Sequence, residues 1–389
     1  MKKRIAVLGS TGSIGNTLLK IISRNQNNFK IEILSAKKNY KQLFKQAEKF
    51  KVQNLIITDK KFYKIALRKK KKKINLYNNF NCFEKILPQK IDYVMNSIVG
   101  LDGLDPTIKI IKKTKTIAIA NKESIICGWY LIQKQLKKYK TRFIPVDSEH
   151  FSIWYALNDI NKKKIDKIYL TASGGSLLNV PKSKFNNLKI SKILKHPNWN
   201  MGEKITIDSS TLMNKVFEII EAKKIFNLKY QQLGIIIHPQ SYVHAIVKFS
   251  DGMIKVIAHD TTMEIPIFNS LYQNQSQNIK TNKINFNILN KTTFLKVDKR
   301  KFPSVNIINM MPEKGSLYET VLVAANDEYV KLFLNKKIKF NDIFYNTLKI
   351  INKNEFKRLK KILPTNISDV INVSKLVKNK INLMNKYKW

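Results

Sequence analysis

The stretch RIAVLGSTGSIG (residues 4–15) joins a short apolar strand to a glycine-rich turn. The residues that follow, Asn16–Ile22, are rich in leucine and isoleucine and predict a helix. In this order of strand, turn and helix, backbone N–H groups at the helix N-terminus approach a pyrophosphate closely. The spacing GxxGxxG differs from the more common GxGxxG, so a tight turn without a ligand is the alternative interpretation.

The end of the second expected strand distinguishes between two dinucleotides. An acidic residue there would bind the ribose of NAD, whereas basic groups would accommodate the additional phosphate of NADP. The sequence at this point is Ser35-Ala36-Lys37-Lys38-Asn39, without a carboxylate. This favours NADPH, and the alternative is that the two lysines belong to the general lysine excess of the chain.

Outward from this loop, β-branched runs alternate with amphipathic stretches, as in the βα units of a parallel sheet. Strands are expected at 4–9, 29–36, 54–58, 93–99, 116–120 and 142–146, then at 167–173, 233–239, 243–249 and 253–260. A helix is expected over about Ser209–Phe226, and from Ser316 onward the apolar spacing is helical. The fold class is therefore α/β. The expected domains are a Rossmann-like NADPH-binding domain (1–150), a central α/β domain (151–290), a linker (291–315) and a C-terminal helical bundle (316–389).

The composition restricts the class of protein. With 389 residues and 43% hydrophobic residues, the chain can bury a large core despite a formal charge of +45. The charge is spread along the chain and carried mostly by lysine, whereas base and phosphate recognition usually prefers arginine, so no specific nucleic-acid partner is expected. No apolar run is long enough to cross a bilayer, so no membrane partner is expected. Two separated cysteines, Cys82 and Cys127, fit a reducing compartment, and the cytoplasm is expected.

An acidic pair follows the strand expected at 142–146. In an extended chain, residues two apart project to the same side, so Asp147 and Glu149 can converge. Two carboxylates without a cysteine cluster suit Mg²⁺ or Mn²⁺ rather than zinc. The alternative is a solvated loop in which Asp147 caps a helix.

Further along, hydroxyl groups precede a helix that carries acidic residues. Ser209, Ser210 and Thr211 are expected at its start, where N–H groups bind anions, and Lys215 adds a positive charge. Asn214, Glu218 and Glu221 share the face opposite the apolar one, and an ordinary solvent-facing surface is the alternative.

Two other segments have a similar character. The turn Thr171–Ser176 (TASGGS) has small residues typical of an anion site, or is a plain strand-to-loop turn. The loop His196–Gly202 (HPNWNMG) is too polar for a helix and carries Trp199, so a lid is expected. His196 is a candidate hydrogen-bond donor to a phosphate, although a lone histidine is more often simply packed in the protein interior. His238 is interpreted as structural.

In these motifs the chain resembles the 1-deoxy-D-xylulose 5-phosphate reductoisomerase family over essentially its full length. The matching segments are GSTGSIG (9–15), ANKES (120–124), PVDSEH (145–150), ASGG (172–175), HPNWNMG (196–202), DSSTLMNKVFEIIEA (208–222), HPQSYVH (238–244) and the C-terminal VAANDEYVKLFL. The resemblance implies conversion of that phosphorylated ketose into 2-C-methyl-D-erythritol 4-phosphate, in the non-mevalonate isoprenoid precursor pathway. It also implies a homodimer, with residues 151–290 as the catalytic and dimerisation domain.

The resemblance assigns roles residue by residue. The implied NADPH contacts are Thr11, Gly12, Ser13, Ile14, Ala36, Lys38, Asn39, Asn121, Glu123 and Gly202. The implied metal ligands, for Mg²⁺ or Mn²⁺, are Asp147, Glu149 and Glu218. The implied substrate contacts are Lys122, Ser148, Glu149, Ser173, His196, Ser209, Asn214, Lys215 and Glu218, and the catalytic candidates are Glu149, Lys122 and Glu218.

The chain departs from the family pattern in a few places. Lys37 stands where glycine is usual, Asp102 and Asp105 make one loop more acidic, and Thr261–Glu264 replaces a usual Pro-Asp-Met-Arg. Two other classes remain as alternatives. A dehydrogenase without the rearrangement would not need the metal, and a nucleic-acid-binding protein would be retained on DNA at physiological salt without oxidising NADPH.

Overall fold

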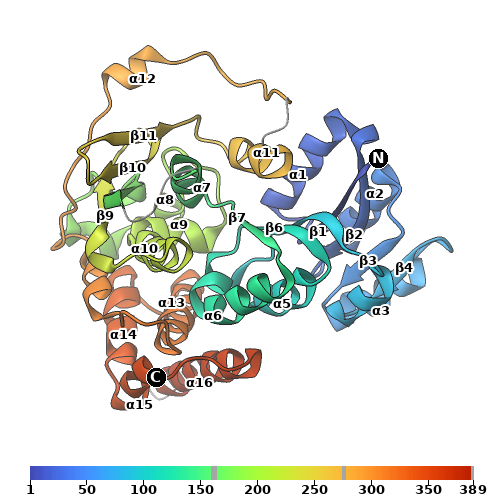
Figure 1. Cartoon of the computed structure of the whole chain (residues 1–389). Helices are drawn as coiled ribbons and strands as arrows, with labels where there is room; N and C mark the ends of the chain where they lie inside the picture. Colours follow the sequence, from blue (N-terminus) through green and yellow to red (C-terminus); the bar gives the residue numbers. More distant parts are fainter. Residues whose placement is uncertain (159–163, 274–276, 387–389) are drawn as a thin grey trace. The chain divides into compact units, whose positions relative to one another are not determined.

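The computed structural model describes residues 1–158, 164–273 and 277–386. The chain, coloured from blue at the N-terminus to red at the C-terminus in Figure 1, forms two compact units. Unit 1 comprises residues 1–124, 131–151 and 263–280, and unit 2 comprises 125–130, 152–262 and 281–389. The chain therefore crosses between the units several times.

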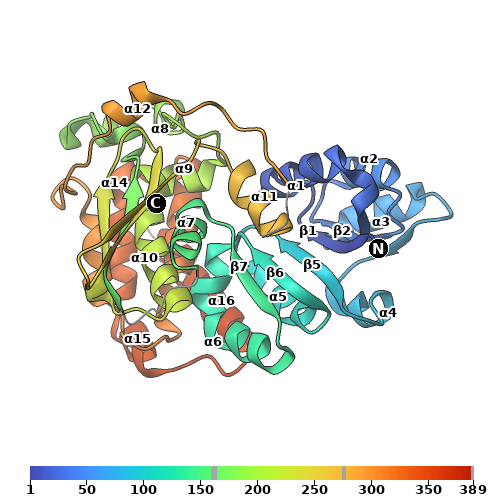
Figure 2. The same ribbon diagram turned by 45° about the horizontal axis from the view of Figure 1, so that its top comes forward.

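Unit 1 contains a seven-stranded sheet in the order β4-β3-β2-β1-β5-β6-β7, and every adjacent pair is parallel. The order reverses between β1 and β5, so the loop after β1 lies at the topological switch point where α/β sheets bind ligands. Figure 2 shows β1, β5, β6 and β7 side by side. The strands are β1 (Lys3–Leu8), β2 (Phe29–Ala36), β3 (Asn54–Ile57), β4 (Asn75–Tyr77), β5 (Ile91–Asn96), β6 (Thr114–Ile119) and β7 (Arg142–Pro145).

The helices of unit 1 bury apolar faces against this sheet. In α1 the residues Leu18, Ile21 and Ile22 are buried at helical spacing, and the central strands are apolar on both faces because helices cover both. The helices are α1 (Ser13–Arg24), α2 (Tyr40–Phe50), α3 (Lys60–Lys69), α4 (Phe83–Ile86), α5 (Leu104–Ile111), α6 (Lys122–Tyr139), α7 (Ser148–Ala156) and α11 (Glu264–Tyr272), with 3₁₀ turns η1 (Gln26–Asn28), η2 (Phe80–Cys82) and η3 (Gly100–Gly103). Of these, α6 and α7 also contribute residues to unit 2.

Helix α11 returns to unit 1 late in the chain and packs on α1. Glu264 forms an ion pair with Arg24 at 2.5 Å, and Ser270 Oγ lies 2.8 Å from the buried Tyr93 hydroxyl. The acidic residue of the unusual Thr261–Glu264 segment therefore has a basic partner within unit 1.

Unit 2 is built on a four-stranded mixed sheet in the order β11-β10-β8-β9. Only β8 and β9 are parallel, and α10 covers one face of the sheet. The strands are β8 (Ile165–Ala172), β9 (Leu233–Ile237), β10 (Val243–Phe249) and β11 (Ile254–Ala258). The helices are α8 (Ile190–Ile193), α9 (Glu203–Ser210), α10 (Met213–Phe226), α12 (Phe286–Asn290), α13 (Tyr318–Leu334), α14 (Phe340–Ile351), α15 (Asn354–Lys357) and α16 (Ile367–Lys386), with 3₁₀ turns η5 (Gly175–Leu177), η6 (Lys182–Asn187), η7 (Tyr230–Gln232), η8 (Pro303–Met310) and η9 (Arg358–Lys361).

The strands expected from the sequence are present, but two details differ. The short strand β4 was not predicted, because its three residues lie in a lysine- and asparagine-rich stretch that hides any alternation. The predicted start of the helix over Ser209–Phe226 is wrong, because α9 ends at Ser210 and α10 begins at Met213. Leu212 between them has φ +57°, a left-handed conformation that interrupts a right-handed helix. In the described part of the chain, no helix has the length and apolar character required to cross a membrane.

Candidate active site

The glycine-rich turn after β1 forms a cradle at the N-terminus of α1. Gly9 has φ +80°, a conformation that favours glycine, and a Cβ atom on Gly15 would lie 2.5 Å from the Gly9 carbonyl oxygen. Gly12 is the N-cap of α1 and supplies no side-chain acceptor for the first-turn N–H groups. These groups are therefore available to an anion, and Thr11, Ser13 and Ile14 lie around them.

The end of β2 lies beside this turn, since Ser35 accepts the backbone N–H groups of Gly9 and Ser10. Ala36 is buried, and Asn39 is the N-cap of α2, its side chain accepting from the Gln42 N–H. Lys38 is exposed. Lys37 Nζ lies 2.7 Å from Asp102 Oδ2, so two of the residues that depart from the family pattern form an exposed ion pair with each other.

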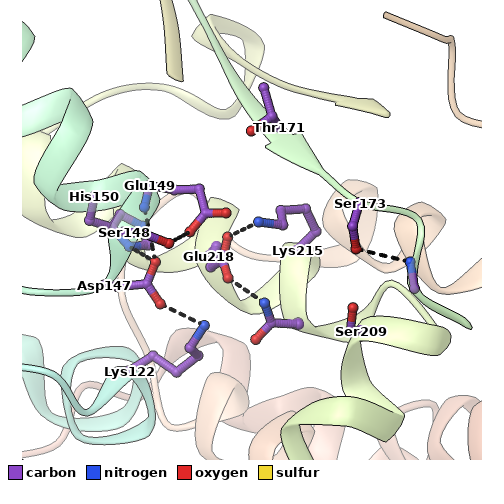
Figure 3. A network of polar contacts seen from close by, with 12 residues as sticks. Lys122, Asp147, Ser148, Glu149, His150, Thr171, Ser173, Ser209, Lys215 and Glu218 are labelled. Carbon is purple, nitrogen blue, oxygen red and sulfur yellow. Dashed lines mark hydrogen bonds and ion pairs between the residues drawn. The ribbon is translucent and has the colours of Figure 1, made fainter. Parts of the chain in front are cut away.

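The N-terminus of α6 contributes three of the predicted residues. The Asn121 side-chain oxygen accepts the Ser124 N–H at 2.7 Å as the N-cap, and its amide nitrogen donates to the carbonyl of Gly100 at 2.5 Å. Glu123 and Lys122 are both buried. The side chain of Asn121 therefore fixes the start of the helix, and Lys122 points towards the acidic residues after β7 (Figure 3).

Within unit 1, Asp147 is the centre of a buried charged group. Its carboxylate lies 2.9 Å from Lys122 Nζ, and His150 Nδ1 lies 3.5 Å from Oδ1. Burial by itself would raise the pKa of Asp147, but the charge of Lys122 and the contact with His150 outweigh it and hold the pKa well below its usual value. Asp147 is therefore a carboxylate near neutral pH. No role was predicted for His150, although it belongs to the motif at 145–150. Its position three residues after Asp147 could have indicated this contact.

Glu149 and Ser148 lie next to Asp147 (Figure 3). Ser148 Oγ donates to Glu149 Oε2 at 2.7 Å, and ligand oxygens of Asp147 and Glu149 lie within 4.8 Å of each other. The two carboxylates converge as expected, but the extended-chain reason was wrong. Helix α7 begins at Ser148, and Asp147 Oδ1 accepts the Glu149 N–H at 3.3 Å, as a helix cap does.

Within unit 2, α10 carries the second set of charged residues. Lys215 Nζ lies 2.5 Å from Glu218 Oε2, and the Asn214 amide donates to the other oxygen of the same carboxylate (Figure 3). The side chains of Lys215 and Glu218 are only 6% and 1% exposed. The solvent-facing alternative for this face is therefore wrong, because these side chains pair inside the protein.

Ser173, His196 and Ser209 meet in unit 2. His196 Nε2 lies 2.9 Å from Ser173 Oγ and 3.2 Å from Ser209 Oγ. His196 Nδ1 accepts the N–H groups of Asn198 and Trp199, so the neutral ring carries its proton on Nε2. Burial, with the charge of Lys215, lowers the pKa of His196 to about 4. Ser209 belongs to the last turn of α9, not to the start of α10 as predicted.

The remaining predicted positions lie in or near the loop at 196–202. This loop contains no helix, as expected, and Gly202 is the N-cap of α9. The structural interpretation of His238 agrees with its contacts, because Nε2 accepts the N–H groups of Tyr242 and Val243.

Comparison with known proteins identifies the family. Models of the 1-deoxy-D-xylulose 5-phosphate reductoisomerase domain and of its two C-terminal domains match residues 5–128, 143–226 and 260–380. The curated 1-deoxy-D-xylulose 5-phosphate reductoisomerase of Pelagibacter ubique is 55% identical, covering 98% of this chain and 99% of that protein. The chain belongs to the 1-deoxy-D-xylulose 5-phosphate reductoisomerase family. A relative from Sulfurihydrogenibium with the same name is 36% identical over 92% of both chains.

Solved structures of reductoisomerases agree with this fold. The Zymomonas mobilis enzyme in complex with NADPH is 29% identical, with a TM-score of 0.88 over 99% of both chains. A DOX-P reductoisomerase in complex with NADPH, fosmidomycin and magnesium is also 29% identical, with a TM-score of 0.91 over 99% of this chain and 98% of that one. The α/β fold class and the reductoisomerase function expected from the sequence are confirmed.

Proposed function

We propose that the chain rearranges 1-deoxy-D-xylulose 5-phosphate and reduces the product with NADPH to 2-C-methyl-D-erythritol 4-phosphate, with Mg²⁺ or Mn²⁺ as the metal. The observation that carries the proposal is the set of carboxylates and lysines, at most 14% exposed, at the predicted positions: Asp147 with Lys122, and Glu218 with Lys215. Buried charges are costly to keep, so their presence favours a catalytic role over a structural one.

The residues of unit 1 fit a dinucleotide. Gly9 and Gly15 let the turn pack closely against neighbouring backbone, and the first-turn N–H groups of α1 have no side-chain acceptor from the N-cap Gly12, so these groups would bind a pyrophosphate. Lys38 and Asn39 at the end of β2 would contact the ribose phosphate, which favours NADPH over NADH. The residues that would hold the cofactor are Thr11, Gly12, Ser13, Ile14, Ala36, Lys38, Asn39, Asn121, Glu123 and Gly202.

The acidic residues fit a hard divalent cation. Asp147 and Glu149 present oxygen ligands within 4.8 Å of each other, and Glu218 is a buried carboxylate whose charge is balanced by Lys215. These three residues would hold the metal, and oxygen ligands without cysteine favour Mg²⁺ or Mn²⁺. When bound, the cation polarises substrate oxygens as a Lewis acid and NADPH provides the hydride.

The other residues would bind and orient the phosphorylated substrate. Ser173 and Ser209 provide hydroxyl groups, and the neutral His196 provides the Nε2–H group that they now share. Lys215 adds a positive charge on α10, and Asn214 and Ser148 fix the carboxylates of Glu218 and Glu149. Lys122 and Glu149 are our candidates for proton transfer. The loop carrying Trp199 would close over the site and keep the intermediate from escaping.

We propose the domains that the sequence indicated: an NADPH-binding domain over 1–150, a central catalytic and dimerisation domain over 151–290, a linker at 291–315 and a helical domain over 316–389. The first domain would also supply Lys122, Asp147 and Glu149 to the catalytic site. We also infer a homodimer. Edge strand β11 exposes Ile254 and Val256 at 55% and 52%, an apolar surface that a second copy would cover. A cytoplasmic location is supported by Cys82 and Cys127, which are both free thiols.

The decisive experiment follows NADPH absorbance with the phosphorylated ketose and Mn²⁺. NADPH oxidation is expected only when substrate and metal are both present, and the product is expected to be the branched polyol phosphate. A dehydrogenase that does not rearrange its substrate would remain active after the metal is chelated. Retention on DNA at physiological salt, without NADPH oxidation, would favour a nucleic-acid-binding protein instead.

A further inference from the structure

The loop that carries Trp199 rests on two stacked histidine rings in unit 2. The Trp199 ring meets His244 edge-on, with centroids 6.2 Å apart and planes at 71°. His244 in turn stacks on His259, with centroids 3.8 Å apart and planes at 15°. The three rings therefore form a continuous column from the loop to the residue just after β11.

The strand pairing explains how His244 reaches both neighbours. The register of β10 against β11 shifts between Val243 and Ala245, and a bulge of this kind redirects a side chain. The His259 N–H donates to the Tyr242 carbonyl at 3.0 Å, which fixes the backbone beside the stack. Burial lowers the pKa of both histidines, so two neutral rings can stack at this distance near neutral pH.

A second connection runs from the same segment to the same loop through hydrogen bonds. Thr261 Oγ1 donates to the Ser241 carbonyl at 3.2 Å, and Ser241 Oγ accepts from the Asn198 amide at 2.7 Å. The Asn198 amide also donates to the Pro239 carbonyl at 2.6 Å. Ser241 has φ +54°, an uncommon conformation for serine, so its position depends on these neighbours.

The loop in turn holds the candidate phosphate-binding residue. The Trp199 N–H donates to His196 Nδ1 at 3.0 Å, which keeps the proton of the neutral ring on Nε2. A displacement of the loop would therefore change both the orientation and the tautomer of His196.

We propose that His259 and Thr261 are positioning residues that hold the Trp199 loop, and through it His196, in place for the substrate phosphate. This inference rests on the proposed function, because it assigns the loop and His196 to substrate binding. Neither residue reaches His196 directly: His259 acts through His244 and Trp199, and Thr261 acts through Ser241 and Asn198.

The test compares His259→Ala with His259→Phe, which keeps a stacked ring without the imidazole nitrogens. Loss of one contact between aromatic rings corresponds to a roughly three- to tenfold change in a binding constant. The KM for the phosphorylated ketose should rise by that factor in His259→Ala and return close to the original value in His259→Phe. The KM for NADPH should not change. Thr261→Val and Thr261→Ser form a second pair with the same expectation, and thermal unfolding checks that each variant is folded.

Two further measurements separate positioning from a general loss of structure. In a Trp199→Ala background, His259→Ala should add no further rise in KM, because the ring column is already broken. The emission of Trp199 is obtained by subtracting the spectrum of a Trp199→Phe variant. In the protein without substrate, acrylamide should quench this emission more strongly in His259→Ala than in the original protein. The inference would be overturned if His259→Ala left the acrylamide accessibility of Trp199 unchanged. It would also be overturned if His259→Ala raised the KM by the same factor in the Trp199→Ala background as in the original protein. If the chain does not turn over the ketose at all, the acrylamide result still decides the inference independently.

Discussion

Two buried pairs of a lysine and a carboxylate occur in the two units, and they are built in different ways. In unit 1, Lys122 follows β6 and Asp147 follows β7, two adjacent parallel strands, and the atoms lie 2.9 Å apart. In unit 2, Lys215 and Glu218 lie on one turn of α10, with atoms 2.5 Å apart. The first pair depends on the sheet, because only parallel pairing brings both strand ends to one edge. The second needs only the helix, in which residues three apart share a face.

The two pairs also differ in how strongly they are shielded. Glu218 is 1% exposed, whereas Asp147 is 14% exposed and has His150 as a further neighbour. An uncompensated charge costs more where water is more completely excluded. The helical pair should therefore be the more sensitive of the two to loss of its partner.

The largest effect is expected from Glu218→Gln, which keeps the shape of the side chain but removes a proposed metal ligand. Turnover should fall by at least about 100-fold, as expected when a metal ligand loses its charge. Steady-state NADPH oxidation over a range of Mn²⁺ concentrations measures the loss. The matched control is Glu319→Gln, another buried carboxylate paired with a lysine in unit 2, Lys224 at 2.9 Å. Equal turnover in the two variants would remove Glu218 from the ligand set.

A smaller effect, on stability, comes from removing each lysine in the absence of metal. Lys122→Met and Lys215→Met each leave a carboxylate without its cation, at a cost of about 3 kcal/mol in the free energy of unfolding. The cost should be greater for Lys215→Met, because Glu218 is the more buried carboxylate. Urea unfolding with and without Mn²⁺ measures both, and added Mn²⁺ should recover part of each loss. A larger loss in Lys122→Met would contradict the ranking of the two pairs.

The third effect is a pH dependence that concerns unit 2. Burial lowers the pKa of His196, His238, His244 and His259 in the folded protein, that of His196 to about 4. Below about pH 6.5 the unfolded chain binds more protons at these sites than the folded chain. Their contribution to stability is thus complete above about pH 6.5 and is lost as the pH falls.

For His196 this loss extends from about pH 6.5 to about pH 4. Urea midpoints over this range should fall less steeply in His196→Asn than in the original protein. Carboxylates titrate at the lower end in both proteins, so the comparison isolates the histidine. Parallel curves would show that His196 does not contribute.

The smallest effect is expected from Lys37→Ala, which removes the exposed ion pair with Asp102. Both side chains are more than half exposed, and such pairs contribute little to stability. The KM for NADPH should change by less than about threefold. Lys38→Ala is the comparison, because this lysine is free of the Asp102 pair and is a proposed contact of the cofactor. A larger effect of Lys37→Ala than of Lys38→Ala would assign cofactor recognition to the unusual lysine.

Most of the elements that could be predicted from the sequence follow from short local motifs. The turn at 9–15 and the strand at 29–36 follow from glycine spacing and from β-branched residues, which act over a few positions. The start of α10 was misplaced because nothing in the sequence indicates that Leu212 takes a left-handed conformation. The role of Asp147 as a cap was visible only as an alternative, since a carboxylate before a helix and one at the end of a strand look the same in sequence.

The order of the elements, the parallel sheet of unit 1 and the positions of the charged residues along the chain could be predicted, because periodicity and composition are local properties of a sequence. That Lys122 lies against Asp147, that Glu218 is buried, and that His259 stacks on His244 beside Trp199 depends instead on how the chain folds. The Lys122–Asp147 and His259–His244 contacts join residues from different segments of the chain. Their distances depend on strand register and helix packing, which no short stretch of sequence specifies.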